Sequence, residues 1–422
     1  MNRYLSILLV CSSLSANAQG VIFTIGGTGT SGHSGDGGQA VSANIALPVK
    51  GRLDNIGNYY FAEWDSNRVR KIDPNGIITT IAGTGVPGFN GNNIAATSAT
   101  LSKPADVIAD SVGNLFIADQ YNFRVRRIDA ATGIITTIAG NGQSTSTGDG
   151  GPAANATIQW PVALAFSKQG ELYICSNSKI RKIDNAGIIT TFLQGAAPIK
   201  AVSFDSSGNM YYIEGLYVKM LDSTGGGPYT LGGVGNAAFS GDGGLAVDAG
   251  MDPVDLAVDH YRNIFVADKM NGRIRWIDSL GNISTVVGGG SWLGDWGPAT
   301  NANIQPGGVT TDTCGNIYIA DGNFRIRKVT YPACHYLVVS VSDITPLSFS
   351  ISPNPATSLI AVSSNKKIKE ITLLNTMGQA VLHRDCNATS AGLNVEQLQA
   401  GVYFIRVSDS MGGVRVEKII KE

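Results

Sequence analysis

The stretch PADVIADSVGNLFIADQYNFRVRRIDAATGIITTIAG, from Pro104 to Gly140, contains four short apolar segments separated by turn residues. The segments are residues 105–109, 115–119, 124–129 and 134–139. Gly113-Asn114 and Thr132-Gly133 stand between them, and glycine and asparagine tolerate the positive φ angles of tight turns. Short segments rich in β-branched and aromatic residues and bounded by such turns predict four strands of an antiparallel meander.

The same unit recurs along the chain. Each copy begins at a proline, and these are Pro48, Pro104, Pro161, Pro198, Pro253 and Pro306. Its third segment carries a basic pair: Arg68/Arg70, Arg124/Arg126, Lys179/Arg181, Arg273/Arg275 and Arg325/Arg327, with Tyr217/Lys219 as a degenerate copy. The sixth copy lacks a fourth segment, whereas residues 21–27 (VIFTIGG) match ITTIAG and precede the first complete copy. Because closing a ring of sheets removes exposed edges, we predict an all-β, six-bladed β-propeller with four antiparallel strands per blade and its last blade completed by the N-terminal strand.

The phrase N-L-F-I-A-D…N-x-R-V-R-R-I-D…G-I-I-T-T-I-A-G resembles the NHL repeat, and this resemblance covers about residues 21–332. The GDGG and GPA segments between the copies are similar to those of NHL-type propellers in extracellular proteins. The resemblance implies a rigid propeller that other molecules bind. Some intracellular NHL propellers bind RNA, but the formal net charge of −1 offers no basic surface for a phosphate backbone, so we expect no nucleic-acid partner.

Residues 1–18 have the pattern of a secretory signal peptide. Arg3 supplies the positive charge, residues 5–14 are mostly apolar, and Ala16-Asn17-Ala18 forms an A-x-A site, which predicts cleavage between Ala18 and Gln19. The alternative is a lipoprotein signal at Cys11, although Val10 is bulky for that motif. Elsewhere no run approaches the ~18 apolar residues of a membrane span, so we expect no transmembrane segment.

Four cysteines follow the signal segment. Cys314 lies before the second strand of the sixth copy and Cys334 lies just beyond its third strand, so a hairpin would bring the two together. We predict a Cys314–Cys334 disulfide, with two unpaired thiols as the alternative. Cys175 replaces the usual alanine of a buried strand and is expected in the core.

One face of the predicted ring should carry the variable loops. In an up-and-down blade, the connection between blades and the loop between the second and third strands share a face. Long connections and aromatic hairpin tips both occur there, and loops on a rigid scaffold often bind ligands. We therefore expect a binding surface formed by Trp64, Tyr121, Phe123, Tyr217, Phe239, Met270, Trp292 and Phe324. The alternative for the aromatics is that they fill grooves between blades.

Carboxylates recur in the same connections, at Asp36, Asp149, Asp242 and Asp295, with Asn92 in the equivalent place. A ring of carboxylates could bind Ca²⁺ or a polyol. The favoured interpretation is structural: aspartate between glycines makes a turn, followed by a short helical turn that it can cap. A second recurring set, Glu63/Arg68, Asp119/Arg124 and Asp268/Arg273, predicts ion pairs across the hairpin tips.

The sequence favours binding over catalysis. The histidines at positions 33 and 260 occupy different places in the repeat, which argues against a three-histidine zinc site. No nucleophile motif or phosphate loop is present. We therefore expect a non-catalytic module that binds an extracellular protein or glycan and needs no cofactor. The alternative is a metal-dependent hydrolase or lactonase with a carboxylate site in the central funnel, for which Ca²⁺ is the candidate ion.

After a linker at 333–346, residues 347–422 form a second module with about seven short predicted strands, typical of a small Ig-like β-sandwich. The motifs SPNPATS…LLNTMGQAV…L-x-x-L-x-A-G-V-Y-F-I-R-V…KIIKE resemble the type A C-terminal sorting domain of the type IX secretion system. The resemblance implies that the type IX machinery recognises residues 347–422 and that residues 19–332 reach the exterior or the outer surface of a Gram-negative bacterium. The alternative is an adhesive Ig-like domain.

Overall fold

The computed structural model describes residues 20–331, 349–375, 380–409 and 414–422. The chain divides into two compact units, with residues 20–331 in the first and the remaining described residues in the second. The signal peptide, its cleavage site at Ala18 and Gln19, the linker and Cys334 lie outside the described residues. Among the residues that are described, no helix is long and apolar enough to cross a membrane.

The first unit is built from antiparallel sheets that follow the sequence repeat. The first sheet contains β2 (Pro48–Leu53), β3 (Tyr59–Glu63), β4 (Arg68–Ile72) and β5 (Ile78–Ala82). The second contains β7 (Pro104–Ala109), β8 (Leu115–Asp119), β9 (Arg124–Ile128) and β10 (Ile134–Ala139), with the two-residue edge strand β6 (Ile94–Ala95). The third contains β12 (Pro161–Phe166), β13 (Leu172–Ser176), β14 (Lys179–Ile183) and β15 (Ile188–Gln194), with edge strand β11 (Gly151–Pro152).

The next two sheets have four strands each. The fourth sheet contains β16 (Ile199–Phe204), β17 (Met210–Glu214), β18 (Tyr217–Leu221) and β19 (Tyr229–Gly232). The fifth contains β20 (Pro253–Val258), β21 (Ile264–Asp268), β22 (Arg273–Ile277) and β23 (Ile283–Gly288). The sixth contains β25 (Pro306–Thr311), β26 (Ile317–Asp321) and β27 (Arg325–Thr330), and it continues through β1 (Val21–Gly26) to the edge strand β24 (Gly297–Pro298).

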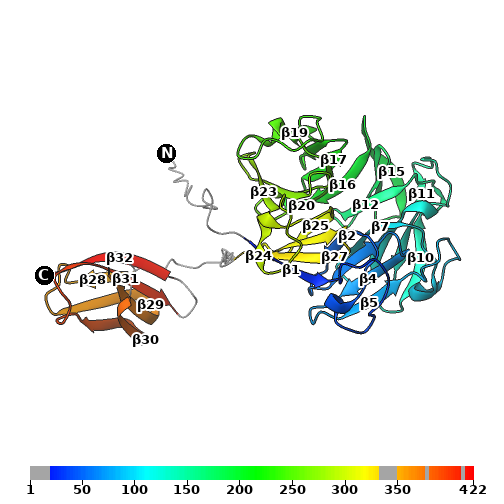
Figure 1. Cartoon of the computed structure of the whole chain (residues 1–422). Helices are drawn as coiled ribbons and strands as arrows, with labels where there is room; N and C mark the ends of the chain where they lie inside the picture. Colours follow the sequence, from blue (N-terminus) through cyan, green and yellow to red (C-terminus); the bar gives the residue numbers. More distant parts are fainter. Residues whose placement is uncertain (1–19, 332–348, 376–379, 410–413) are drawn as a thin grey trace. The chain divides into compact units, whose positions relative to one another are not determined.

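The N-terminal strand completes the sixth sheet, as the repeat pattern predicts. β1 pairs antiparallel with β27, with Val21 opposite Thr330 and Thr24 opposite Arg327. In Figure 1 the blue β1 accordingly lies between the yellow strands β27 and β24. The two ends of the first unit therefore meet within one sheet.

The first strands of the six sheets gather in the middle of the unit, and the fourth strands lie outside (Figure 1). The first strands contact one another in the cyclic order β2, β7, β12, β16, β20, β25 and back to β2. Apolar side chains pack between neighbouring sheets. One such cluster joins Val69 and Leu101 to Val107 and Ile117, and another joins Phe265 and Ile274 of the fifth sheet to Ile22 and Val309 of the sixth. The β-branched residues of the repeat thus form the core between sheets.

Aspartates fix the turns after most first strands. In each, one carboxylate oxygen accepts the backbone N–H groups two and four residues later, as at Asp54, Asp110, Asp205, Asp259 and Asp312. This is the Asx-turn geometry that favours aspartate at the start of a turn. The third sheet departs from the pattern, with Ser167 and Glu171 at these positions.

Short 3₁₀ helices follow the connections between sheets. Five are related by the repeat: η1 (Ala40–Ser42), η2 (Ala96–Ser98), η4 (Ala153–Asn155), η5 (Ala246–Asp248) and η6 (Ala299–Asn301). The helical turn predicted after the Gly-Asp-Gly segments is therefore present. The predicted cap is wrong, because none of these five helices has a side-chain hydrogen bond at its N-cap. The remaining helix, η3 (Gln120–Asn122), forms the tip of the second sheet.

The second unit contains β28 (Phe349–Ser352), β29 (Leu359–Leu374), β30 (Ala380–Asn394), β31 (Gly401–Asp409) and β32 (Val414–Lys421). These five strands replace the seven short ones predicted for the described part of this module. Two predicted strands, 359–362 and 368–374, merge into β29 because the residues between them include no glycine or proline that would break it. The N-terminal half of β29 pairs with β28, and its C-terminal half pairs with β31.

Candidate functional site

A buried arginine of the third strand ties each of five sheets to the connection that precedes it. Arg70, Arg126, Arg181, Arg275 and Arg327 are fully buried, and we call each one with its carboxylates an arginine latch. Arg70 is typical: its Nη2 lies 2.7 Å from Asp36 Oδ1 in the connection, and its Nη1 lies 3.3 Å from Glu63 Oε1 at the hairpin tip. The fourth sheet has the pair Lys219–Glu214 instead.

The latches correct the predicted pairing across the hairpin tips. Glu63 is opposite Arg68 in the strand register, yet its carboxylate pairs with Arg70, two residues further on. Asp119 and Asp268 likewise pair with Arg126 and Arg275, and not with Arg124 and Arg273. Arg68 instead donates to the carbonyl oxygens of Ser66 and Thr84. Residues two apart in a strand share a face, so alternation alone does not separate the two partners.

The four carboxylates considered for Ca²⁺ are engaged in these latches. Asp36, Asp149, Asp242 and Asp295 each lie between 2.6 and 3.1 Å from a latch guanidinium. Burial raises the pKa of Asp149, but the Thr191 hydroxyl and Arg181 outweigh it and the net shift is downward. Because each carboxylate already neutralises a buried cation in a different sheet, the set does not converge on one cation site.

The latch of the second sheet is incomplete. Asn92 stands where the other connections have aspartate, which leaves Asp119 as the carboxylate facing Arg126, at 3.6 Å. The Nε and Nη1 atoms of Arg126 have no hydrogen-bond partner among the described residues. Burial raises the pKa of Asp119 to about 6, although the Ser102 N–H, Asn122 and Arg126 act to lower it. The buried Arg126 guanidinium is therefore only partly compensated by the described residues.

Asn92→Asp is expected to raise the free energy of unfolding by about 1 kcal/mol, because it supplies the missing carboxylate at a partly exposed site. The Thr137 hydroxyl that donates to Asn92 matches the Thr191 hydroxyl that donates to Asp149, so the new side chain keeps this contact. Urea unfolding measures the change. Asp149→Asn is the matched control and should lower stability by a similar amount; an unchanged midpoint for Asn92→Asp contradicts the assignment.

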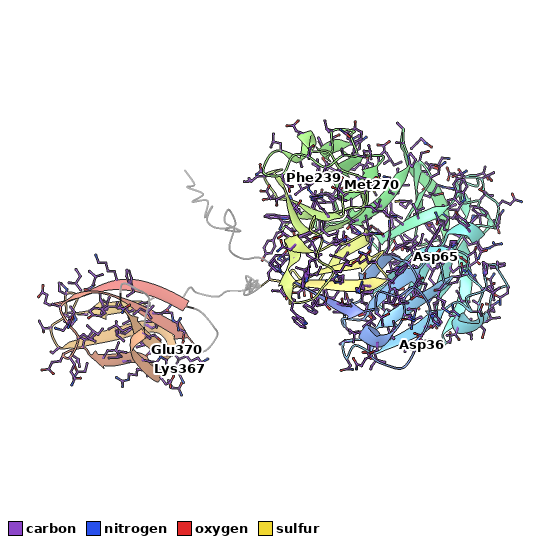
Figure 2. All side chains as sticks on the ribbon, in the orientation of Figure 1. Asp36, Asp65, Phe239, Met270, Lys367 and Glu370 are labelled. Atoms are coloured by element: carbon purple, nitrogen blue, oxygen red, sulfur yellow. The ribbon has the colours of Figure 1, made fainter. Side chains whose placement is uncertain are left out.

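The predicted aromatic binding residues have different surroundings in the structure. Trp64 and Tyr121 meet edge to face, with ring centroids 5.9 Å apart, and Lys103 Nζ lies 4.2 Å from the Trp64 ring. Phe239, which is labelled in Figure 2, is stacked on latch residue Arg275 and on Arg273. This contact supports the groove-filling alternative for Phe239.

The other five predicted residues belong to the second, fourth, fifth and sixth sheets and their connections. Met270 is 78% exposed and lines a hollow of about 480 Å³ between the tip of the fifth sheet and the connection to the sixth (Figure 2). Trp292 covers Gly294 and Gly297, and Tyr217 starts β18 near Gly235. Phe123 and Phe324 are half-buried and occupy left-handed conformations just before the third strands of their sheets.

Charged side chains close the axis of the first unit. Arg52 of β2 forms a bidentate pair with Asp255 of β20, with both N···O distances 2.9 Å. Lys50 Nζ lies 3.5 Å from the same carboxylate and donates to the Lys200 carbonyl at 2.7 Å, and Arg52 lies 4.0 Å from Asp106 of β7. We call Lys50, Arg52, Asp106 and Asp255 the axial network. It connects the first sheet to the second, fourth and fifth.

The two aspartates of the axial network are fully buried but differ in charge environment. Burial raises the pKa of Asp106, and Arg52 and Lys50 compensate only in part. Burial also acts on Asp255, but its bidentate contact with Arg52 and its proximity to Lys50 lower the pKa below the usual range. The backbone N–H groups of Leu164 and Val309 also donate to these carboxylates. Two cations thus offset two carboxylates, and the protein's own groups occupy the axis.

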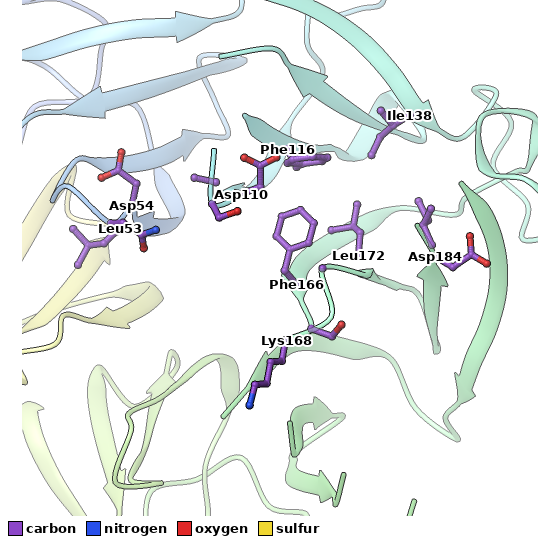
Figure 3. A pocket seen from close by; sticks show the side chains of 15 residues that line it. Leu53, Asp54, Asp110, Phe116, Ile138, Phe166, Lys168, Leu172 and Asp184 are labelled. Atoms are coloured by element: carbon purple, nitrogen blue, oxygen red, sulfur yellow. The ribbon is translucent and has the colours of Figure 1, made fainter. Parts of the chain in front are cut away.

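Sequence reasoning missed a depression of about 600 Å³ in the first unit. It lies beside the turns that follow the first strands, on the face opposite the variable loops. Its floor is apolar: Phe116 and Phe166 pack edge to face with centroids 5.0 Å apart, beside Ile138 and Leu172 (Figure 3). We call this hollow the turn-face depression.

The rim of the turn-face depression is acidic. Asp54, Asp110 and Asp184 stand around it with one cation, Lys168 (Figure 3). Each of these aspartates also accepts two backbone N–H groups of its own turn. Aspartates at the equivalent turn positions have the same structural role throughout the repeat. The sequence therefore did not distinguish these three aspartates as ligand-binding residues. The detectable signal was Phe166 followed by Ser167 and Lys168 where other copies carry the aspartate turn.

The cysteine predictions have separate outcomes. Cys175 is fully buried, as expected, and burial raises the pKa of its thiol to about 12. Cys314 is exposed in the turn before β26. Its predicted disulfide partner, Cys334, lies outside the described residues, so that bridge stays a prediction.

Two family models match parts of the chain. Residues 350–422 match the secretion system C-terminal sorting domain, and residues 141–200 match the Teneurin NHL domain. The first match covers nearly all of the second compact unit, where the sequence motifs predict a sorting domain. The second falls on the third sheet and the connection before it.

Curated relatives and solved structures resemble the first unit. Mouse Teneurin-4 is 25% identical over 69% of this chain and 12% of its own length, and mouse Teneurin-3 is 30% identical over 37% and 6%. The chain thus spans a small fraction of these relatives. An auxiliary nutrient binding protein from Bacteroides thetaiotaomicron VPI-5482 has a TM-score of 0.58 at 18% identity, covering 75% of this chain and 77% of that one. One from Bacteroides ovatus ATCC 8483 has a TM-score of 0.56 at 15% identity, covering 75% and 78%. These structures show a shared all-β, propeller-like fold.

Proposed function

We propose that this NHL-repeat propeller, whose C-terminal sorting domain indicates type IX export to the cell surface or beyond, binds an extracellular ligand without catalysing a reaction. The observation that carries the proposal is the axial network. A metal-dependent hydrolase needs carboxylates free to hold a cation at the axis, whereas Asp106 and Asp255 face Arg52 and Lys50. Two structures with a similar fold are described as auxiliary nutrient binding proteins, which is compatible with a binding role.

The proposal includes a finer description of both units. We infer that the six sheets are the blades of a six-bladed propeller, an inference supported by the cyclic contacts of their first strands and by the β1–β27 pairing. We infer an Ig-like sandwich for the sorting domain. The division of β29 between β28 and β31, around a single apolar cluster, supports two layers.

The turn-face depression is the proposed ligand site. An apolar floor with three carboxylates and one ammonium at its rim favours a ligand that combines an apolar group with a positive charge. A basic, partly apolar peptide segment has that chemistry. Of the protein and glycan ligands expected from the sequence, a protein ligand suits this hollow better.

The test is peptide display on the immobilised full chain. Peptides that combine basic and apolar side chains should be enriched, and their binding should weaken about tenfold when Asp54, Asp110 and Asp184 are all changed to asparagine. Asparagine also forms Asx turns, so the turns should persist. Asp259→Asn and Asp312→Asn alter the same turn position in the fifth and sixth sheets and serve as controls. No enrichment, equal loss in the controls, or Ca²⁺-dependent turnover of lactone or ester substrates would argue against the proposal.

A further inference from the structure

One position in the repeat carries a tryptophan where its counterparts are small. Five connections pass through an equivalent residue whose backbone N–H donates to the carbonyl of a buried isoleucine in the fourth strand, at 2.8 or 2.9 Å. These residues are Gly37, Asn93, Gly150, Gly243 and Trp296, and all five have a positive φ. The shared hydrogen bond shows that the backbone is the same in each copy, so the side chain is what differs.

The tryptophan is unfavourable for the backbone at this position. The φ of Trp296 is 70°, a left-handed conformation that is sterically costly for a bulky residue and free of cost for glycine. Burial of the side chain does not offset this steric cost, because Trp296 is 74% exposed. Such a residue persists when its surroundings hold it in place, and this combination is typical of functional positions.

A second substitution in the same copy provides the partner of Trp296. Phe23 of β1 occupies a position that is threonine or serine in four of the five equivalent outer strands, at Thr79, Thr136, Thr190 and Ser284, and tyrosine in β19, at Tyr229. The rings of Phe23 and Trp296 are stacked with centroids 4.8 Å apart and planes 7° from parallel. We call these two residues the rim pair. β1 and β24 form the outer edge of the sixth sheet, so the pair stands on the rim of the propeller (Figure 1).

We propose that the rim pair is a stacking platform for a neutral sugar ring of an extracellular glycan. Phe23 covers one face of the indole and fixes its plane, while most of the Trp296 surface remains open to solvent. A flat, pre-oriented aromatic face is complementary to the apolar C–H face of a pyranose ring, and holding it rigid reduces the entropy lost on binding.

Charge and area favour a neutral sugar over other ligands. The carboxylate of the adjacent Asp295 pairs with Arg327 and accepts from Thr24. Lys328, opposite Phe23 in the register, places its Nζ 4.9 Å from the Tyr318 ring of β26, so neither cation is directed at the platform to attract a phosphate or sulfate. In the connection that carries Trp296, the other exposed large apolar side chains are Trp292 and Leu293. A stable protein interface buries about 800 Å² on each partner, which is far more than these few side chains offer. This platform lies outside the turn-face depression and goes beyond the proposed function.

Affinity electrophoresis of the full chain in gels containing laminarin, xylan, galactomannan or dextran tests the proposal. Wild-type protein should be retarded by at least one of these neutral polysaccharides, and Trp296→Gly should weaken that retardation about tenfold or more. Trp296→Gly introduces the glycine that three other copies of the repeat have at this position, and glycine adopts a positive φ without steric cost. The variant should therefore fold at least as well as the wild type. Phe23→Thr, the sibling residue in β1, should weaken binding in the same way.

Met270→Ala removes another highly exposed apolar side chain and should leave the retardation unchanged. No retardation by any of the four polysaccharides, or equal retardation of wild type and Trp296→Gly, overturns the platform. Concentration-dependent self-association that Trp296→Gly abolishes also overturns it, because the surface would then be a protein interface. Peptide binding at the turn-face depression is independent of these outcomes, so the proposed function and the platform can fail separately.

Discussion

Arg52→Met is expected to lower the free energy of unfolding by about 3–5 kcal/mol, because it leaves buried carboxylates without their main counter-charge. Asp255 would lose both hydrogen bonds of its bidentate pair, and Asp106 would lose its nearest guanidinium. Methionine fills much of the volume of the arginine stem, so the change tests charge compensation more than packing. Urea denaturation at neutral pH measures the loss.

Arg127→Met is the matched control for this experiment. Arg127 of β9 pairs with Asp129 at 3.1 Å, but both side chains are about one-third exposed, so the cost should be below about 1 kcal/mol. The double variant Arg52→Met/Asp255→Leu should lose less stability than the sum of the two single variants, because the residues interact directly. Equal losses in the free energy of unfolding for Arg52→Met and Arg127→Met would show that the axial network stabilises the fold no more than an exposed ion pair does.

Deletion of residues 20–27 is expected to abolish cooperative unfolding of the propeller or to cost more than about 4 kcal/mol. The deletion removes β1, including the fully buried Ile22, and exposes the edge of β27. An unpaired edge strand is a template for association, so the deleted protein should also form oligomers. Differential scanning calorimetry and size-exclusion chromatography report the two effects.

A rearranged chain separates the role of the strand from the role of its position. In this variant the chain begins at residue 28, and Val329 is followed by the Asp-Pro-Asn-Gly turn of residues 73–76 and then by residues 21–27, which keeps the register of the first sheet. The sixth sheet then has the hairpin connection seen in the first. The rearranged protein should recover a single cooperative transition. A deletion that leaves the melting transition unchanged, or a rearrangement that rescues nothing, would mean that β1 does not complete the sheet.

The repeat pattern was sufficient to predict the sheets of the first unit and the place of its N-terminal strand. Turn residues and strand segments recur at fixed offsets, so errors in one copy are corrected by the others. The ion pairs of the latches were predicted with the wrong arginine, which lies two residues before the one that forms the pair in the structure. Arg68 and Arg70 point to the same side of a strand, and only the position of the connection, with Asp36, decides which of them is buried.

The axial network and the turn-face depression could not be read from the sequence. Lys50, Arg52, Asp106 and Asp255 lie in three different copies, and they meet only because the first strands surround one axis. The depression is formed by turns whose aspartates have a structural role in every copy. In the second unit, strand lengths were underestimated because β29 continues through a bend without the glycine or proline that usually ends a strand.

The pairing of β1 with β27 also sets an order of events in biogenesis. The ribosome delivers β1 at the start of this unit and β27 at its end, so no shortened product can complete the sixth sheet. The sorting domain at 350–422 emerges after both strands. A chain that carries the complete sorting domain therefore already contains every strand of the sixth sheet, so the order of synthesis places the export signal behind a complete first unit.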